Sequence, residues 1–220
     1  MKNYYNIIET LVGILCVDKG KLKVLLKIKQ TDPYKGYWIL PGGILENNET
    51  LQTNVTNVIF NSTHIKNMYF KECHVFSDLN RDPDDRILAA SFIALTTKEI
   101  VAMNEVSGES ELKWFELNAL PKMGYDHNAI LNKINSEVRN SILSNHSDVI
   151  LKLFPNDFTI PELQKCYENV LGKQLDRRNF RKKLILQDII VDTGFKTSGG
   201  AGRPGTLYRF NSKNRSDFNA

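Results

Sequence analysis

The sequence has 220 residues, of which 41% are hydrophobic and 25% are charged, and its formal net charge at pH 7 is +4. These values are typical of a folded globular protein and exclude a disordered chain, a collagen-like repeat and a disulfide scaffold. No apolar run approaches the roughly 20 residues that a membrane helix needs, and residues 1–6 lack the apolar core of a signal peptide, so we expect a cytoplasmic protein without a membrane partner.

The positive charge is concentrated towards residue 220. Residues 151–220 contain 13 Lys and Arg against 7 Asp and Glu, a net charge of +6, whereas residues 1–150 contain 16 against 18, a net charge of −2. Such an asymmetry is expected when a module that binds a polyanion follows another domain, although a solvated basic surface gives the same counts. We therefore expect two domains with different partners.

Strand-like and helical segments alternate in the first 125 residues. Two β-rich runs at residues 11–17 and 23–29 flank turn residues at 18–21 and predict a hairpin. The segments that follow are a short strand at 37–43, a helix at 51–63 and strands at 69–76, 87–95 and 113–117. This order predicts an α+β protein whose first domain is an α/β/α sandwich.

The three cysteines are predicted to be structural. Cys16, Cys73 and Cys166 are odd in number, far apart, and each lies in an apolar-periodic stretch. This pattern is typical of buried thiols and argues against a disulfide or a metal site.

A further helix is expected over residues 126–150. Ile130, Ile134, Val138 and Ile142 recur every four residues with Leu131 beside them, which gives one apolar stripe. Two hypotheses fit this stripe: it packs on its own domain, or it forms part of a dimer interface.

A specific pattern surrounds Gly43. The stretch LPGGILENNETL at residues 40–51 resembles the opening of the Nudix box, in which a glycine precedes a glutamate and a helix that carries Arg-Glu and Glu-Glu. Gly43 takes the position of the first glycine and Glu49 that of the first glutamate, while Ile59 and Ile65 take two apolar positions. The resemblance covers about residues 8–125 and implies a Nudix fold.

The carboxylates of the Nudix helix are missing. In Nudix hydrolases, glutamates at i, i+3 and i+4 hold Mg²⁺ against the substrate phosphates and help to activate water. The equivalent positions here are Val58, Asn61 and Ser62, the arginine position is Asn57, and the closing glycine is His64. The resemblance therefore implies a pocket without catalytic residues, metal or cofactor. Glu49 is expected to accept hydrogen bonds from loop amides, and His64 to act as a cation at the helix C-terminus.

The loop before residue 87 supplies candidate ligand contacts. Residues 77–86, SDLNRDPDDR, resemble the Arg-Asp-Pro segment of Nudix proteins that act on or sense ADP-ribose. Two arginines in this loop are suited to bidentate phosphate contacts, and two aromatic residues before the Nudix box are suited to stacking on a base or sugar. The predicted ligand-binding residues are Tyr37, Trp38, Glu49, Arg81 and Arg86. In the alternative hypothesis Arg81 pairs with Asp82 across the turn.

Residues 158–187 predict two helices joined by a short turn. Thr159 and Glu162 stand in capping-box relation, Pro161 lies in the first turn, and the helix is expected to end at Gly172. Asp176 is placed to cap the second helix, in which Phe180 and Leu184 face the core. The second helix also carries five cations: Arg177, Arg178, Arg181, Lys182 and Lys183.

Two strands at residues 189–193 and 206–210 follow, joined by a Gly-rich loop. Helix, short turn, basic helix and hairpin is the order of a winged helix-turn-helix domain, which places its second helix in the major groove. RNA is less favoured, because no aromatic-rich strand offers a stacking platform. The predicted DNA-binding residues are Arg177, Arg178, Asn179, Arg181, Lys182, Lys183, Lys196 and Arg203.

A degenerate Nudix domain followed by a winged helix resembles the Nudix-related transcriptional regulators, most specifically over residues 167–183. The resemblance implies a Nudix-like ligand-binding domain at 1–130, a linker helix at 131–150 and a winged helix DNA-binding domain at 151–220. It further implies a homodimer that binds a double-stranded DNA operator under the control of a small-molecule effector, which is ADP-ribose or a related NAD metabolite in one branch and a pentose sugar in another. Two alternatives stay open: a Nudix-type pyrophosphohydrolase with a nucleic-acid-binding tail, and a module whose basic tail binds an acidic protein.

Overall fold

The computed structural model describes residues 6–98, 100, 111–143, 148–198 and 204–211. The chain divides into two compact units, the first made of residues 1–16 and 23–137 and the second of residues 17–22 and 138–220. Within the described ranges, no helix is both long and apolar enough to cross a membrane.

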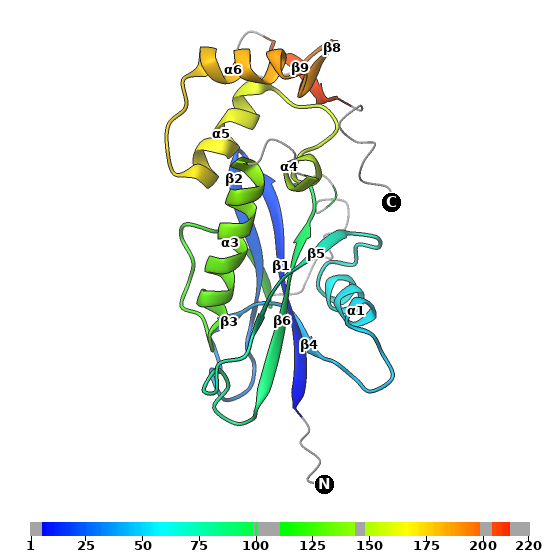
Figure 1. Ribbon diagram of the computed structural model, residues 1–220, viewed down its shortest axis with the longest axis vertical. Helices are drawn as coiled ribbons and strands as arrows, with labels where there is room; N and C mark the ends of the chain where they lie inside the picture. The colour runs from blue at the N-terminus through cyan, green and yellow to red at the C-terminus, as the bar shows by residue number, and fades with distance from the viewer. Residues whose placement is uncertain (1–5, 99, 101–110, 144–147, 199–203, 212–220) are drawn as a thin grey trace. The chain divides into compact units, whose positions relative to one another are not determined.

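The first unit contains a mixed sheet whose described strands number seven (Figure 1). Its central strand, β1 (Ile7–Asp18), runs parallel to β6 (Ile87–Leu95), and the main strand order is β3-β2-β1-β6-β5. The remaining strands are β2 (Lys21–Ile28), β3 (Trp38–Ile39), β4 (Gly42–Ile44), β5 (Tyr69–Phe76) and β7 (Leu112–Glu116). β4 pairs with β1, which brings the Nudix-box loop to the centre of the sheet.

Helices cover both faces of this sheet (Figure 1). Because side chains alternate along β1, Val12 and Ile14 join α1 (Leu51–Thr63) in one apolar cluster. Gly13 between them faces α3 (His127–Leu143), and a Cβ atom there would lie 2.7 Å from Ile134 Cδ1. The glycine therefore allows α3 to approach the sheet closely. The predicted α/β/α sandwich is confirmed.

The apolar stripe of α3 is buried within the chain. Its five residues are at most 4% exposed: Ile130, Leu131, Ile134, Val138 and Ile142. The stripe is thus core, and the hypothesis that it forms a dimer interface is wrong. The helix expected over 126–150 is observed as α3 and α4 (Asp148–Leu153), with residues 144–147 outside the described ranges.

The second unit contains α5 (Ile160–Leu171), α6 (Arg177–Leu186) and the hairpin of β8 (Ile190–Lys196) and β9 (Thr206–Phe210). α5 begins with the predicted capping box of Thr159 and Glu162 and ends at Gly172, which has a left-handed φ of 66°. Phe158 pairs with Tyr208 of β9 and packs against Phe210 with ring centroids 4.5 Å apart. These contacts join the start of α5 to the hairpin, and the predicted winged helix is confirmed.

Two of the three cysteines are buried as predicted. Cys16 is 4% exposed and Cys166 is fully buried, so burial raises the pKa of the Cys166 thiol to about 12. Cys73 is only half-buried, because it lies on β5 at the edge of the sheet. The prediction of a buried thiol is wrong at Cys73.

Candidate nucleic-acid interface and ligand pocket

The cations of α6 are accessible to solvent. Arg177, Arg178, Arg181, Lys182 and Lys183 are all exposed. Leu184 is buried, and Phe180 packs edge-on against Tyr167 with ring centroids 5.2 Å apart. Since each residue turns the helix by roughly 100°, Arg178 and Lys182 lie on the face away from Leu184. α6 thus has an apolar inner face and a basic outer face.

Local hydrogen bonds fix where α6 begins. The Asp176 carboxylate accepts a hydrogen bond from the backbone N–H of Asn179 at 2.8 Å, as the sequence predicts. α6 itself contains no acidic residue, so no carboxylate within the helix neutralises its cations. Arginine and lysine on such a face are suited to phosphate contacts, while arginine and asparagine also match the base edges of the major groove.

A bulge shapes the β8–β9 hairpin beside α6. Three residues of β8 stand between Asp192 and Lys196, opposite a single residue of β9. The Asp192 carboxylate accepts from the Gly194 N–H at 2.8 Å, and Gly194 has a left-handed φ of 77° that favours glycine. Within the bulge, Phe195 is 70% exposed, and Lys196, which follows the bulge, is also exposed. Arg203, the other predicted contact of the wing, lies outside the described residues.

Arg181 also has a partner in the hairpin. Its Nη2 donates a hydrogen bond to the Tyr208 hydroxyl at 3.4 Å. This contact joins α6 to β9, because Tyr208 is itself buried in the second unit. Arg181 therefore has a structural contact as well as an exposed charge.

The Nudix-box segment lines a cavity of about 380 Å³ in the first unit. Its lining includes Gly42, Gly43 and Val58, and the polar part of the lining is rich in amides. The polar side chains are those of Lys27, Glu49, Asn54, Asn57, Asn61, Ser62 and Glu111. The cavity thus carries two carboxylates, one cation and several neutral hydrogen-bonding groups.

These side chains do not fit the Mg²⁺ site of a Nudix hydrolase. Ser62 donates its hydroxyl to the Val58 carbonyl at 2.8 Å, and the helix offers an amide at Asn61 in place of a carboxylate. Within the described part of the chain, no group of three or more His, Cys, Asp or Glu side chains is arranged to hold a metal. A hard divalent cation at a phosphate site needs more carboxylate oxygens than this face provides.

Glu49 acts as a hydrogen-bond acceptor within the loop. Its carboxylate accepts from the side-chain amide of Asn54 and from the backbone N–H of Glu46, the latter at 3.1 Å. The hydrogen bond from Asn54, followed by that from Glu46, lowers the pKa of Glu49. The predicted hydrogen bond to a loop amide is present, and the same side chain lines the cavity.

Arg81 has partners that the sequence analysis did not predict. The side chain is 2% exposed, and its Nε and Nη2 donate to the Asp126 carboxylate at 3.0 Å each, while Nη1 donates to Glu9 at 2.8 Å. The predicted pair with Asp82 is wrong, because Asp82 instead accepts from the backbone of its own turn. With its guanidinium occupied by two carboxylates, Arg81 holds the loop to the sheet and is not presented to a phosphate.

The other predicted ligand residues are not brought together. Arg86 donates to the carbonyls of Ser77 and Asp78 at 2.9 and 3.1 Å, which closes the same loop. Tyr37 lies beneath the Lys122 ammonium at 4.5 Å, and Trp38 packs edge-on against Phe115 at 4.7 Å. Of the five predicted residues, Glu49 lines the cavity.

The sequence analysis missed three polar residues of the cavity. Asn54 is 5% exposed and links the loop to α1 by donating to the Ile44 carbonyl at 2.9 Å. Lys27 and Glu111 come from β2 and the residue before β7, with Lys27 Nζ 3.9 Å from Glu111. An asparagine within the apolar face of a predicted helix is a sequence signal that could have identified Asn54. Lys27 and Glu111 carry no such signal, because they meet only through strand pairing.

Comparisons with known proteins agree with this geometry. Residues 150–210 match the family model of the NrtR DNA-binding winged helix domain. The "ADPR responsive transcriptional repressor NtrR" of Acinetobacter baylyi is 28% identical over 203 residues, which cover 90% of this chain and 80% of that protein. An ADP-ribose pyrophosphatase of Methanocaldococcus jannaschii is 28% identical over 133 residues, 60% of this chain and 76% of that protein.

A solved structure shares the fold of both units. Shewanella oneidensis NrtR, crystallised with a 27mer DNA, superposes with a TM-score of 0.77 at 24% identity and covers 95% of each chain. The match therefore includes the sandwich as well as the winged helix. A Nudix-fold domain thus precedes a winged helix domain of the NrtR type, and over most of its length the chain is similar to a transcriptional repressor of Acinetobacter baylyi.

Proposed function

We propose that the protein is a ligand-responsive transcriptional regulator that binds an operator through the outer face of α6 and the wing. The observation that carries this proposal is the set of five exposed cations on α6, the second helix of a winged helix domain. Phosphate contacts from these cations supply affinity and register, and Arg178 and Asn179 are the proposed readers of base edges. The proposed boundaries are 1–130 for the sensor, 131–150 for the linker and 151–220 for the DNA-binding domain.

We further propose that the Nudix-fold domain senses its ligand and does not hydrolyse it. The replacement of the carboxylate positions by Val58, Asn61 and Ser62 supports this proposal. ADP-ribose is the first effector to test, because the Acinetobacter baylyi relative is named for its response to that molecule. The amides of the cavity are suited to ribose hydroxyls, and Lys27 is a cation for a phosphate. The same amides also fit a pentose, which is the second effector to test.

A homodimer is the proposed functional state, because winged helix regulators bind symmetric half-sites as dimers. The apolar stripe of α3 is buried, so the dimer interface must lie elsewhere on the surface. Sedimentation equilibrium with and without the operator tests this state.

The DNA-binding proposal is tested with duplexes selected from a randomised pool. Affinity for the enriched duplex is then measured by fluorescence anisotropy at several salt concentrations. The double variant Arg178→Ala/Lys182→Ala is expected to lower the slope of log Kobs against log salt by about two, since each phosphate contact contributes about 0.9. Arg139→Ala, which removes an exposed arginine of α3, is the matched control and should leave the slope unchanged. Equal slopes for both variants would remove the outer face of α6 from the interface.

The sensor proposal is tested with ADP-ribose on the full chain. ADP-ribose is expected to release the enriched duplex, and AMP should not accumulate when Mg²⁺ or Mn²⁺ is added. Rapid AMP release would refute the sensor proposal and show that the protein is a pyrophosphohydrolase. Release of the duplex by arabinose or ribose, but not by ADP-ribose, would assign the pocket to a free sugar.

A further inference from the structure

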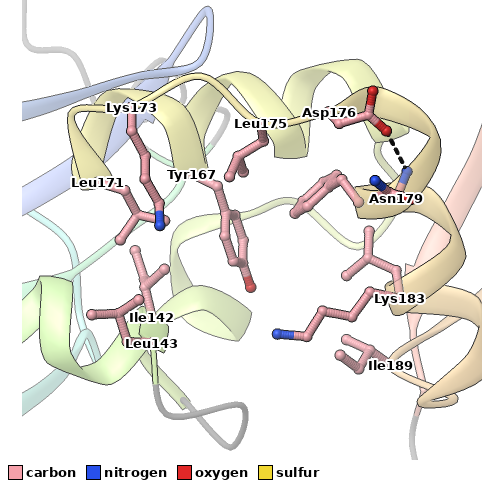
Figure 2. A pocket seen from close by; sticks show the side chains of 12 residues that line it. Ile142, Leu143, Tyr167, Leu171, Lys173, Leu175, Asp176, Asn179, Lys183 and Ile189 are labelled. Atoms are coloured by element: carbon pink, nitrogen blue, oxygen red, sulfur yellow. Dashed lines mark hydrogen bonds between the residues drawn. The ribbon is translucent and has the colours of Figure 1, made fainter.

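A second cavity lies within the winged helix unit, on the inner side of α6 (Figure 2). Its volume is about 270 Å³, near the lower end of small-molecule pockets. The walls are formed by the end of α3, by α5 and by α6 with the residues that flank it. The lining residues used below are Ile142, Leu143, Tyr167, Lys173, Asp176, Asn179, Phe180, Lys183 and Leu184.

The walls of this cavity are largely apolar. Ile142 and Leu184 are 4% and 2% exposed and belong to the core, while Leu143 is 55% exposed at the opening. Phe180 and the ring of Tyr167, packed edge-on at 5.2 Å, add an aromatic wall. An apolar surface of this kind is suited to a ring or a branched aliphatic group.

Five polar side chains break this apolar lining: Tyr167, Lys173, Asp176, Asn179 and Lys183. The Asp176 carboxylate already accepts a hydrogen bond from the backbone N–H of Asn179. Figure 2 shows the Tyr167 hydroxyl and the Lys183 ammonium directed into the cavity, while Lys173 extends from the connection after α5. Among the described residues, none forms a hydrogen bond with the Tyr167 hydroxyl or an ion pair with either ammonium. Burial raises the pKa of Tyr167 to about 12, so its hydroxyl remains a proton donor at neutral pH. The cavity thus combines donors and positive charge with an apolar wall.

We propose that this cavity is a small-molecule site for a compact organic anion, separate from the Nudix pocket. The apolar body of the anion would lie against Ile142 and Phe180, and its carboxylate or phosphate would accept hydrogen bonds from Tyr167 and Lys183. Lys173 adds a second positive charge, which favours an anion over a neutral ligand of the same shape.

The same site has a consequence for DNA binding, and this consequence rests on the proposed function. Asn179 and Lys183 line the cavity and also belong to the proposed DNA surface. An anion bound to Lys183 competes with a DNA phosphate for that ammonium and adds negative charge behind α6. Occupancy of the cavity therefore weakens operator binding.

Phenylacetate is the test ligand, because it joins an aromatic ring to one carboxylate, and phenylacetamide is its neutral counterpart. Isothermal titration of the full chain without DNA should detect phenylacetate and give at least tenfold weaker binding of phenylacetamide. Tyr167→Phe and Lys173→Gln should each weaken phenylacetate binding by about tenfold. Equal affinity for the acid and the amide, or no binding of either, would overturn the proposed site.

A charge placed at the opening provides an independent test. Leu143→Glu introduces a carboxylate at an exposed position and should abolish phenylacetate binding, whereas Leu79→Glu, at a 77% exposed leucine of the first unit, should not. Unchanged binding in Leu143→Glu would place the ligand elsewhere. When DNA binding is measured, phenylacetate should weaken the affinity of the parent chain for the selected duplex but should not change that of Leu143→Glu. If phenylacetate binds without changing DNA affinity, the regulatory consequence is overturned, while failure of the chain to bind any duplex overturns the proposed function instead.

Discussion

Replacement of Arg81 by methionine is expected to lower the free energy of unfolding of the first unit, because it leaves two carboxylates without the cation that pairs with them. Arg81 is 2% exposed and donates three hydrogen bonds to Glu9 and Asp126, each of which is 19% exposed. Removing one partner from a buried ion pair costs about 3 to 5 kcal/mol. Because both carboxylates retain some contact with water, we expect a loss near the lower end, about 3 kcal/mol.

The loss should depend on pH. Burial already raises the pKa of Glu9, although Arg81 opposes this effect, and loss of the guanidinium raises it further. A carboxyl group whose folded-state pKa lies above its unfolded value stabilises the fold at low pH and loses this contribution as pH rises. The deficit of Arg81→Met relative to the parent chain should therefore be smaller at about pH 5 than at about pH 8.

Urea unfolding followed by tryptophan fluorescence measures this loss of stability in the first unit. Both tryptophans, Trp38 and Trp114, lie in the first unit. Arg86→Met, in the same loop but exposed and bonded only to carbonyls, is the control and should cost less than about 1 kcal/mol. Equal costs for the two variants, or a deficit that does not change with pH, would refute the structural role. If Arg81→Met binds ADP-ribose more weakly but is as stable as the parent chain, Arg81 is a ligand-binding residue after all.

Three further substitutions test other contacts of the first unit by the same unfolding assay. Burial lowers the pKa of His127 to about 3, and its Nδ1 accepts from the Leu40 N–H at 2.9 Å. The neutral folded form thus supplies stability that is present above the unfolded pKa of 6.5 and is lost as pH falls towards 3. Between about pH 7 and pH 5 the parent chain should lose about 2 kcal/mol of stability through His127, and His127→Asn should not show this loss. An unchanged pH profile in the variant would exclude the histidine as the source of the loss. His64 ends α1 with a left-handed φ of 56°, so His64→Gly should raise stability by up to about 1 kcal/mol, whereas a lower stability would mean that its ring contact with Phe60 dominates. At Gly42 a Cβ atom would lie 2.7 Å from the Thr10 carbonyl oxygen, so Gly42→Ala should cost about 1 to 3 kcal/mol, and a neutral result would show that β4 can shift away from β1.

Features set by neighbouring residues could be predicted from the sequence. The capping groups of α5 and α6, Thr159 and Asp176, hydrogen-bond to residues three positions later, so a short stretch of sequence contains the whole interaction. The apolar spacing of α1 likewise predicted its bounds, Leu51–Thr63. The wing was predicted less well, since strand β8 continues to Lys196 through a bulge that its alternation does not encode.

Features set by distant residues could not be predicted. The partners of Arg81 lie 45 and 72 positions away, and their meeting depends on how the loop folds over the sheet. The cavity residue Glu111 reaches Lys27 only because β7 pairs with β2. The arginines of the loop carry the residue types of a phosphate site, but the fold gives them structural partners, and residue type alone does not distinguish these roles.

The continuity of α3 determines how the protein can be divided for experiments. This single helix supplies Ile134, which fills the space above Gly13, and also Val138 and Ile142, which count among the buried residues of the second unit. A fragment that ends at residue 130 would lose Ile134 and expose the sheet beneath it. A fragment that begins at residue 151 would lose Ile142 and with it one wall of the cavity behind α6. Expressed fragments of the winged helix should therefore begin at or before residue 138, and those of the sandwich should end after residue 137.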